Sequence, residues 1–368
     1  MSLRSALGLS IFLVSAAFAP ADTVFASCYT NAGSKGIYAV SFDEATGMLG
    51  QPVLAAATAN PSFIILSPNG DRLFACNELS GSGGAASFAV NRDHLTFLSA
   101  QSTGGKGPCH LALSADTKVL YLANYPSGSL ASLPVDADGI LHPATSVIPF
   151  KGSGPNHERQ ASPHAHCTVV DPSGRYLLVC DLGSDRIWTF SIDQTTDTLS
   201  PAPVPFAVMP PGTGPRHLQF APNGKDVYLV SEMASTVTAM HWHPENGRLE
   251  PFQTISMLPA GFSGKNTAAE LQFDSGGRHL YASNRGDDSI VVYNIAADGT
   301  LTLAQRAPVG GHTPRYFALD PSQHFVLVAL QDSGQIRVLR RDPANGQLSP
   351  TGQSVDLSRV VCLAFGVE

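Results

Sequence analysis

The chain has 368 residues, of which 14% are charged, and its formal net charge is -7. No run of Lys and Arg resembles the basic stripe that follows a phosphate backbone, so nucleic acid is not an expected partner. None of the cysteines has the C-x-x-C spacing of a zinc or redox site, and most lie in apolar segments, so we expect buried free thiols. The six are Cys28, Cys76, Cys109, Cys167, Cys180 and Cys362.

The first 21 residues have the pattern of a signal peptide. Arg4 precedes an apolar run around Leu13, and small residues end the segment at Ala19-Pro20-Ala21. This pattern predicts cleavage near Ala21 and a periplasmic or secreted product. No later stretch approaches the ~20 apolar residues of a spanning helix, so no membrane span is expected. We expect residues 22–368 to form a single domain.

A repeat runs through the rest of the chain. Its unit is a polar entry, an alternating apolar strand, a turn rich in Pro, Asn, Asp and Gly, and a second apolar strand, as in residues 61–77. Six copies follow one another, with equivalent residues 47, 57, 50, 53 and 46 positions apart. These spacings are typical of the four-stranded blades of a β-propeller.

A second turn, between the outer strands, gives a blade count of seven. It occurs first at residues 43–49 and last at residues 342–348. The difference of one predicts that the C-terminal strand 360–365 pairs beside the N-terminal strand 23–29, which would close the ring and remove its exposed edges. The sequence therefore predicts an all-β, seven-bladed propeller of four-stranded antiparallel blades. Its longest loops, 143–163 and 257–266, both enter inner strands, and long loops often carry function.

Two columns of equivalent residues are expected to line one mouth of the central channel, because the first begins each inner strand and the second ends the neighbouring antiparallel strand. The strand-entry column is Ser62, Cys109, His166, Arg216, Ala269 and Arg315. The second column, sixteen residues further on in each blade, is Glu78, Tyr125, Leu182, Glu232, Arg285 and Gln331.

The columns gather charge in consecutive blades, at His166, Arg216, Glu232, Arg285 and Arg315. Arginine side chains bind anions through paired N–H groups, and a His or Glu moves protons. Two interpretations stay open at this point. The cluster is a catalytic site for an anionic substrate, or it is a salt-bridged plug that satisfies the ends of the strands.

The loop before the third inner strand adds Arg159 and His164 as candidate substrate-binding residues. His164 and His166 share a strand face, which also suits a metal, but no third ligand has matching spacing, so we predict neither metal nor cofactor. A G-x-S-x-G elbow and a Gly-rich phosphate loop are both missing, which argues against a serine hydrolase and against a nucleotide site.

Several of these segments resemble the seven-bladed lactonase family, which contains cycloisomerase-type 6-phosphogluconolactonase and carboxy-cis,cis-muconate cyclase. The resemblance covers essentially the whole chain after residue 21. It is most specific in residues 152–159, 162–166, 181–186, 214–217, 283–286 and 313–315.

The resemblance implies a propeller enzyme that acts on a small lactone or carboxylate and needs no metal. His166, Arg216, Glu232 and Arg285 match the proposed active site of the cyclase branch. In a lactonase the arginines would hold the substrate's anionic group and the developing oxyanion, while Glu232 or His166 activates water.

A sugar lactonase of the 6-phosphogluconolactonase type is the leading prediction. Cyclisation of a carboxylated muconate in the same site is the first alternative, and a non-catalytic binding propeller is the second. Export bears on the substrate, because sugar-phosphate lactones arise in the cytoplasm. An unphosphorylated or aromatic-derived lactone is therefore also considered.

Overall fold

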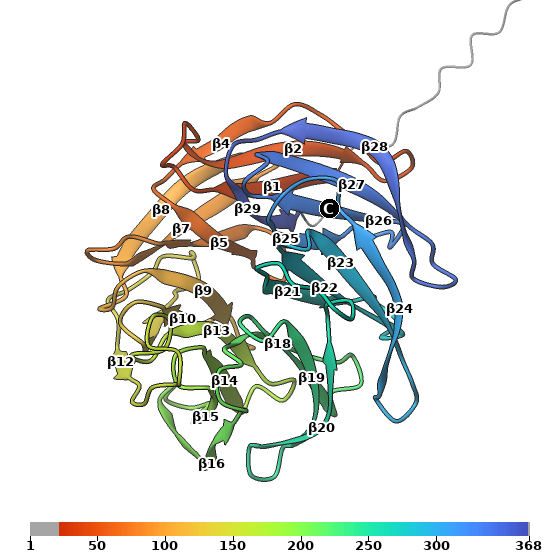
Figure 1. The fold of residues 1–368 in the computed structure, drawn as a ribbon. Coiled ribbons are helices and arrows are strands. Elements are labelled where there is room, and N and C mark those ends of the chain that lie inside the picture. Colours follow the sequence, from red (N-terminus) through yellow and green to blue (C-terminus); the bar gives the residue numbers. More distant parts are fainter. Residues whose placement is uncertain (1–21, 367–368) are drawn as a thin grey trace, which may run out of the picture.

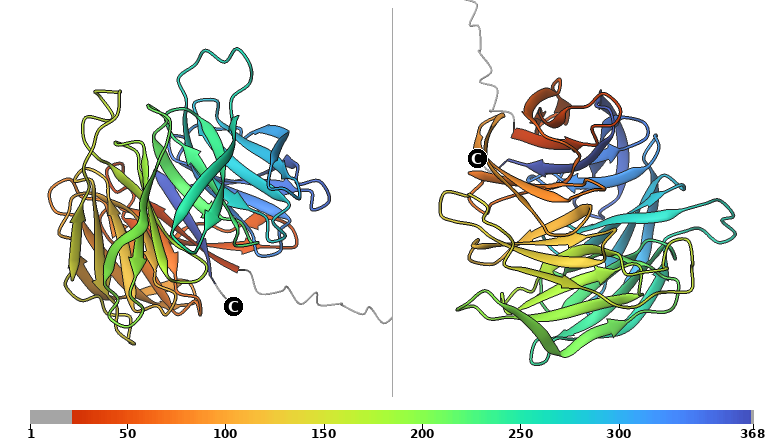
Figure 2. Two further views of the ribbon diagram at one scale, coloured as in Figure 1. Left: turned by 90° about the horizontal axis from the view of Figure 1, so that it is seen from below. Right: turned by 90° about the vertical axis from the view of Figure 1, so that its left-hand side faces the viewer.

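The computed structural model describes residues 22–366, and the predicted signal peptide lies outside them. This part of the chain contains strands and no helices, and none of its segments forms a helix able to cross a membrane. The strands form seven antiparallel sheets arranged in a ring, in chain order (Figure 1). Figure 2 shows the ring from two further sides. The predicted seven-bladed propeller is confirmed.

Six blades each use four consecutive strands, and the first of the four is the innermost. The bounds of the first three such blades are β5 (Pro61–Leu66), β6 (Arg72–Asn77), β7 (Gly84–Asn91), β8 (His94–Ser102); β9 (Pro108–Leu113), β10 (Val119–Asn124), β11 (Ser129–Pro134), β12 (Ser146–Pro149); and β13 (Ala165–Val170), β14 (Tyr176–Asp181), β15 (Arg186–Ile192), β16 (Leu199–Val208). The other three are β17 (Pro215–Phe220), β18 (Asp226–Ser231), β19 (Thr236–His243), β20 (Arg248–Ser256); β21 (Thr267–Phe273), β22 (His279–Arg285), β23 (Ser289–Ile295), β24 (Leu301–Pro308); and β25 (Pro314–Leu319), β26 (Phe325–Leu330), β27 (Gln335–Arg341), β28 (Leu348–Asp356).

The seventh blade is built from both ends of the chain, as the sequence predicts. Its inner strand is β29 (Val360–Phe365), which pairs with β1 (Asp22–Cys28) in the register Val24 to Phe365. The blade continues through β2 (Gly36–Asp43), with β3 (Met48–Leu49) and β4 (Val53–Ala57) on its outer side. The red and blue strands therefore lie side by side in Figure 1. One expectation needs correction, because β12 forms inside the segment 143–163 that was expected to be a loop.

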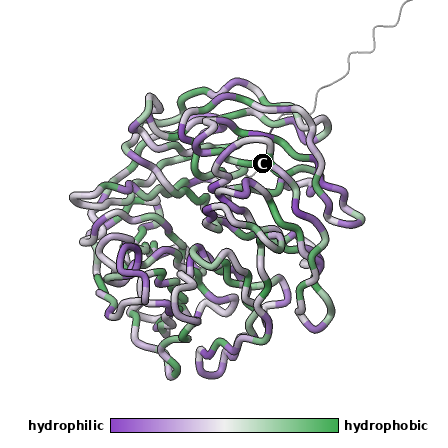
Figure 3. Tube along the Cα trace, viewed as in Figure 1, coloured by the Kyte–Doolittle hydropathy of each residue, from purple (hydrophilic) through white to green (hydrophobic). Residues whose placement is uncertain are grey.

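The core lies between neighbouring blades. The second strands β10, β14, β18 and β26 are buried at every position, because another blade covers each of their faces. This explains their continuous apolar runs, in contrast to the alternating outer strands. In Figure 3 the hydrophobic residues follow the strands. All six cysteines are buried free thiols within this packing, as their positions predict.

Every inner strand carries a β-bulge at the same place. Pro215 pairs with Ser231 and His217 with Val230, so Arg216 is an extra residue, and four other inner strands show the same pattern. In β5 and β21 the one-residue shift falls within residues 61–64 and 268–271. A bulge re-aims side chains and interrupts the ladder. The equivalent residues in these bulges, which we call the entry ring, are Ser62, Cys109, His166, Arg216, Ala269, Arg315 and Val361. The predicted strand-entry column is thus a ring of bulge residues.

Candidate active site at the channel mouth

A buried carboxylate, Glu232, lies at the centre of the candidate site. It directly follows β18, and its backbone N–H donates to the carbonyl of Gly214 at 2.8 Å, beside the start of β17. Its own carbonyl accepts from Ala268 of the next blade at 3.0 Å. The side chain is 7% exposed. Two blades therefore fix the position from which this carboxylate faces its neighbours.

Three arginines bind the carboxylate of Glu232. Arg159 Nη2 lies 2.6 Å from Oε1, while Arg216 Nε and Arg285 Nη2 lie 3.0 and 2.9 Å from Oε2. Arg216 and Arg285 also donate to the carbonyls of Ala269 and Ala268, at 2.5 and 2.9 Å. The sequence predicted that these side chains meet. The sequence did not predict the pairing of Arg159 with Glu232, because it suggested that Arg159 binds substrate.

The charges in this cluster fix the protonation state of Glu232. Burial by itself would raise the pKa of the carboxyl group, but Arg285 and Arg216 outweigh it and the pKa falls to about 2. Burial lowers the pKa of Arg285 to about 10, against the opposing effect of Glu232. All these groups are therefore ionised at neutral pH. Glu232 acts as a fixed counter-ion and is a poor acceptor for a proton from water.

His166 lies in the same channel mouth, and its imidazole ring makes no hydrogen bond to the described residues. Its Nδ1 atom is buried and has no hydrogen-bond partner within residues 22–366, and the ring meets that of Tyr125 edge-on at 5.6 Å between centroids. Burial and then Arg216 hold the pKa of His166 well below its usual value. The imidazole is therefore neutral and has a free lone pair, which is the state a base needs.

Arg315 is the cation that the cluster leaves free. Its guanidinium lies over the ring of Tyr29, 5.5 Å from the centroid, and the Tyr29 hydroxyl donates to Glu78 at 2.9 Å. In the described part of the chain the guanidinium of Arg315 makes no hydrogen bond or ion pair. A half-buried guanidinium in this state is available to an anionic ligand.

His164 lies beside the cluster and is committed to Tyr125. Its Nδ1 is 3.0 Å from the Tyr125 carbonyl oxygen, and the two rings stack at 4.6 Å. The Tyr125 hydroxyl accepts from Arg159 at 3.2 Å. His164 therefore supports the residue that holds Arg159, and its predicted contact with substrate stays a prediction.

Asp185 anchors the loop that carries Arg159. Its carboxylate accepts hydrogen bonds from the backbone N–H groups of Gly212 and Gly214, at 2.7 and 2.8 Å, and from Gln160 Nε2 at 2.9 Å. The same side chain thus ties Arg159's neighbour to the start of β17, which carries Arg216. The sequence pattern does not reveal this role, although Asp185 lies in one of the family-like segments.

Asp185→Asn is expected to loosen this loop. An amide offers N–H groups where the carboxylate accepts, so at least one charged hydrogen bond is lost, at a cost of about 2 kcal/mol in the free energy of unfolding. Chemical denaturation measures this loss. The exposed Asp193→Asn provides the control, because its carboxylate caps only its own turn. Equal stability of wild type and Asp185→Asn would contradict the anchoring role.

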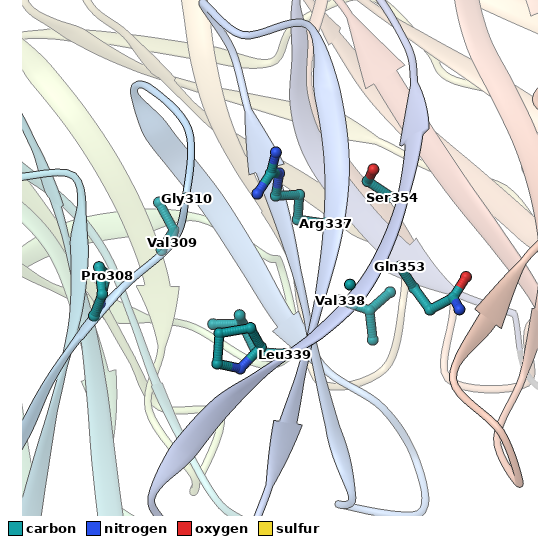
Figure 4. A pocket seen from close by; sticks show the side chains of 10 residues that line it. Pro308, Val309, Gly310, Arg337, Val338, Leu339, Gln353 and Ser354 are labelled. Atoms are coloured by element: carbon teal, nitrogen blue, oxygen red, sulfur yellow. The ribbon is translucent and has the colours of Figure 1, made fainter.

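One hollow on the outer side of the ring is less suited to chemistry. The pocket in Figure 4 has a volume of about 210 Å³ and lies on the outer part of the ring, between β24, β27 and β28. Arg337 is its one titratable lining residue. Within residues 22–366, no three His, Cys, Asp or Glu side chains meet in a way that would hold a metal ion.

The fold and the site together define a propeller with an arginine-rich, histidine-containing channel mouth. A family model described as "Lactonase, 7-bladed beta-propeller" matches residues 23–365. A 6-phosphogluconolactonase of Bacillus subtilis is 32% identical over 344 residues, covering 93% of this chain and 97% of that protein. The chain belongs to the seven-bladed β-propeller lactonase family, which confirms the resemblance found in the sequence.

Solved structures of similar proteins agree. The periplasmic gluconolactonase of Pseudomonas aeruginosa has 38% sequence identity and a TM-score of 0.90, covering 94% of this chain and 99% of its own. A putative 6-phosphogluconolactonase of Bacteroides fragilis has 35% identity and a TM-score of 0.88, covering 95% of this chain and 98% of its own. The likeness therefore extends over the whole ring.

Proposed function

We propose that the protein is an exported lactonase that hydrolyses a sugar lactone, with its active site at the arginine-rich channel mouth. The observation that carries this proposal is the pair of uncommitted groups, His166 and Arg315, beside the Glu232 cluster. A salt-bridged plug would leave neither an unpaired guanidinium nor an unpartnered buried imidazole. The names of the relatives support a lactone as the substrate.

In the proposed reaction, Arg315 binds an anionic or polyhydroxyl part of the substrate. Water attacks the lactone carbonyl while His166 accepts a proton from it. Arg216 and Arg285 face the negative charge that develops on the carbonyl oxygen, and Glu232 keeps these two guanidiniums in place. Collapse of the tetrahedral intermediate breaks the ring C–O bond, and the released alkoxide takes up the proton of the new carboxyl group to give the open-chain hydroxy carboxylate.

The likeness to a periplasmic gluconolactonase and the signal-like N-terminus support an extracytoplasmic site of action. This location favours an unphosphorylated sugar lactone, while Arg315 also suits a phosphate. Hydrolysis of glucono-1,5-lactone and of 6-phosphogluconolactone by residues 22–368 tests the proposal, with correction for spontaneous opening. We expect enzymatic opening of at least one. Activity on neither, with lactonisation of a carboxylated muconate instead, would replace it by the cycloisomerase alternative.

A further inference from the structure

A second ring of side chains lies one residue further along each inner strand, where the bulge also re-aims the chain. The proposed chemistry uses none of them. Six of its members line a cavity of about 340 Å³ in the channel, namely Phe63, His110, Cys167, His217, Glu270 and Tyr316. We call these six the second ring. Four of them, His110, Cys167, His217 and Glu270, are buried and titratable.

His217 and Glu270 form a fixed pair in the second ring. His217 Nδ1 lies 3.1 Å from Glu270 Oε2, and Glu270 Oε1 accepts from the backbone N–H of Leu271 at 3.0 Å. The backbone N–H of Glu270 donates to Ser283 Oγ at 3.1 Å. Because the carboxylate accepts at Nδ1, the neutral His217 carries its proton there and has its lone pair on Nε2. That Nε2 atom is buried and has no partner within residues 22–366.

The pair lies directly behind the proposed base. The rings of His166 and His217 are 5.1 Å apart between centroids and meet at 63°. His166 belongs to the entry ring on β13, and His217 belongs to the second ring on β17. Both rings have one buried nitrogen without a partner. The order His166, His217, Glu270 therefore leads from the active-site mouth into the cavity of the second ring.

Lactone hydrolysis needs such a path. Lactone and water give a carboxylate and one proton, and that proton appears among the guanidiniums of Arg159, Arg216, Arg285 and Arg315. These charges disfavour an imidazolium at His166, so a proton accepted there must move on. Glu232 is a poor acceptor because it binds three of the four arginines. Glu270 is a buried carboxylate that lines the cavity of the second ring, and the side chain paired with it is the neutral His217.

We propose that His217 and Glu270 form a proton relay that takes the proton from His166 and passes it to water in the cavity of the second ring. Because no hydrogen bond joins the two rings, a water molecule between them carries the proton from His166 to His217 Nε2, while Nδ1–H is given to Glu270 Oε2. Glu270 then releases the proton to water in the cavity, and a flip of the neutral His217 ring brings its N–H back to Glu270 Oε2. No oxidant, metal or co-reactant takes part. The relay rests on the proposed lactonase function.

The surroundings of His217 set the pH range of the relay. The titratable groups that face it are Glu270 on β21, His110 on β9, His166 and Cys167 on β13, Tyr316 and Arg315 on β25, and Arg216 on its own strand. Burial, opposed by Arg216, raises the pKa of Glu270 to about 7. The relay accepts protons only when Glu270 is ionised, so kcat should fall as the pH drops through about 7.

The test compares the wild type with His217→Gln, Glu270→Gln and the double variant, across pH 5 to 9, by direct measurement of lactone consumption. Gln219→Ala, which changes another residue lining the same cavity, is the control. We expect each single variant to lower kcat about tenfold or more with KM unchanged, and the double variant to be no slower than the singles, because they interrupt one path. In Glu270→Gln the fall of kcat near pH 7 should vanish.

If the wild type hydrolyses the lactones and both single variants keep its kcat and pH profile, the relay is overturned and the proposed lactonase function stands. A wild type inactive on the lactones would overturn both. If Glu270→Gln does not fold, Glu270→Asp decides the question, because it keeps a carboxyl group. A fall of kcat with falling pH in Glu270→Asp supports the relay, and a flat profile overturns it.

Discussion

Arg315→Met is expected to lower kcat/KM for the lactone by about 100-fold or more while leaving the protein as stable as the wild type. Arg315 has no ion pair or hydrogen bond in the described chain, so the substitution removes its stacking on Tyr29 and its longer-range attraction to Glu78 and Glu232, but no direct polar contact. Methionine keeps most of the apolar stem. A large loss of activity with a small change of Tm therefore distinguishes a ligand-binding arginine from a structural one.

The matched control is Arg337→Met, which removes a partly buried arginine from the outer pocket of Figure 4. We expect wild-type kcat/KM for this variant. Steady-state kinetics and thermal unfolding of the three proteins provide the comparison. A fall of Tm in Arg315→Met large enough to explain its loss of activity by unfolding would show that Arg315 is a structural part of the ring.

Glu232→Gln is expected to damage both activity and stability. The neutral amide leaves three guanidiniums close together without their counter-ion, of which that of Arg216 is buried and that of Arg285 is only 13% exposed. The fall of the Glu232 pKa from its usual 4.5 to about 2 corresponds to about 3 kcal/mol of stability at neutral pH. Denaturant unfolding at pH 7 should show a loss of about this size. kcat should fall by about 100-fold or more, because Arg216 and Arg285 lose their fixed orientation.

The difference in the free energy of unfolding between wild type and Glu232→Gln should decrease as the pH falls. Because folding depresses this pKa, the stability that Glu232 contributes is complete above about pH 4.5 and is lost as the pH falls through about 2. Wild type and Glu232→Gln should therefore converge in stability toward pH 2. Glu250→Gln, which alters an exposed carboxylate, should change little throughout. A difference that stays constant down to pH 2 would contradict the ionised state assigned to Glu232.

The fold was predictable because the same strand–turn–strand pattern recurs several times along the chain. The second strands are mostly apolar, each turn repeats its Asp, Asn or Gly, and the one turn in excess of the six strand repeats indicates closure by β29 and β1. β12 was not predictable in the same way. Its four residues alternate between half-buried and exposed positions, so they show too little apolar periodicity to separate a short edge strand from a loop.

The site was predictable only in part. The two columns correctly bring His166, Arg216, Glu232 and Arg285 to one mouth, since equivalent positions in a ring must face the same way. Sequence could not show which guanidinium binds Glu232, because Arg159 reaches it from a long loop held by Asp185. It also missed His217 and Glu270. Simple alternation sends neighbours of a channel residue away from the channel, whereas a bulge turns both toward it.

The most direct test of the account is a crystal structure of the protein with the product aldonate bound, gluconate first and then its 6-phosphate. The account predicts that the ligand lies in the channel mouth, with an anionic group within hydrogen-bond distance of Arg315 and its carboxylate facing Arg216, Arg285 and His166. Binding only in the outer pocket between β24 and β28, with the channel mouth closed by Arg315 itself, would contradict it.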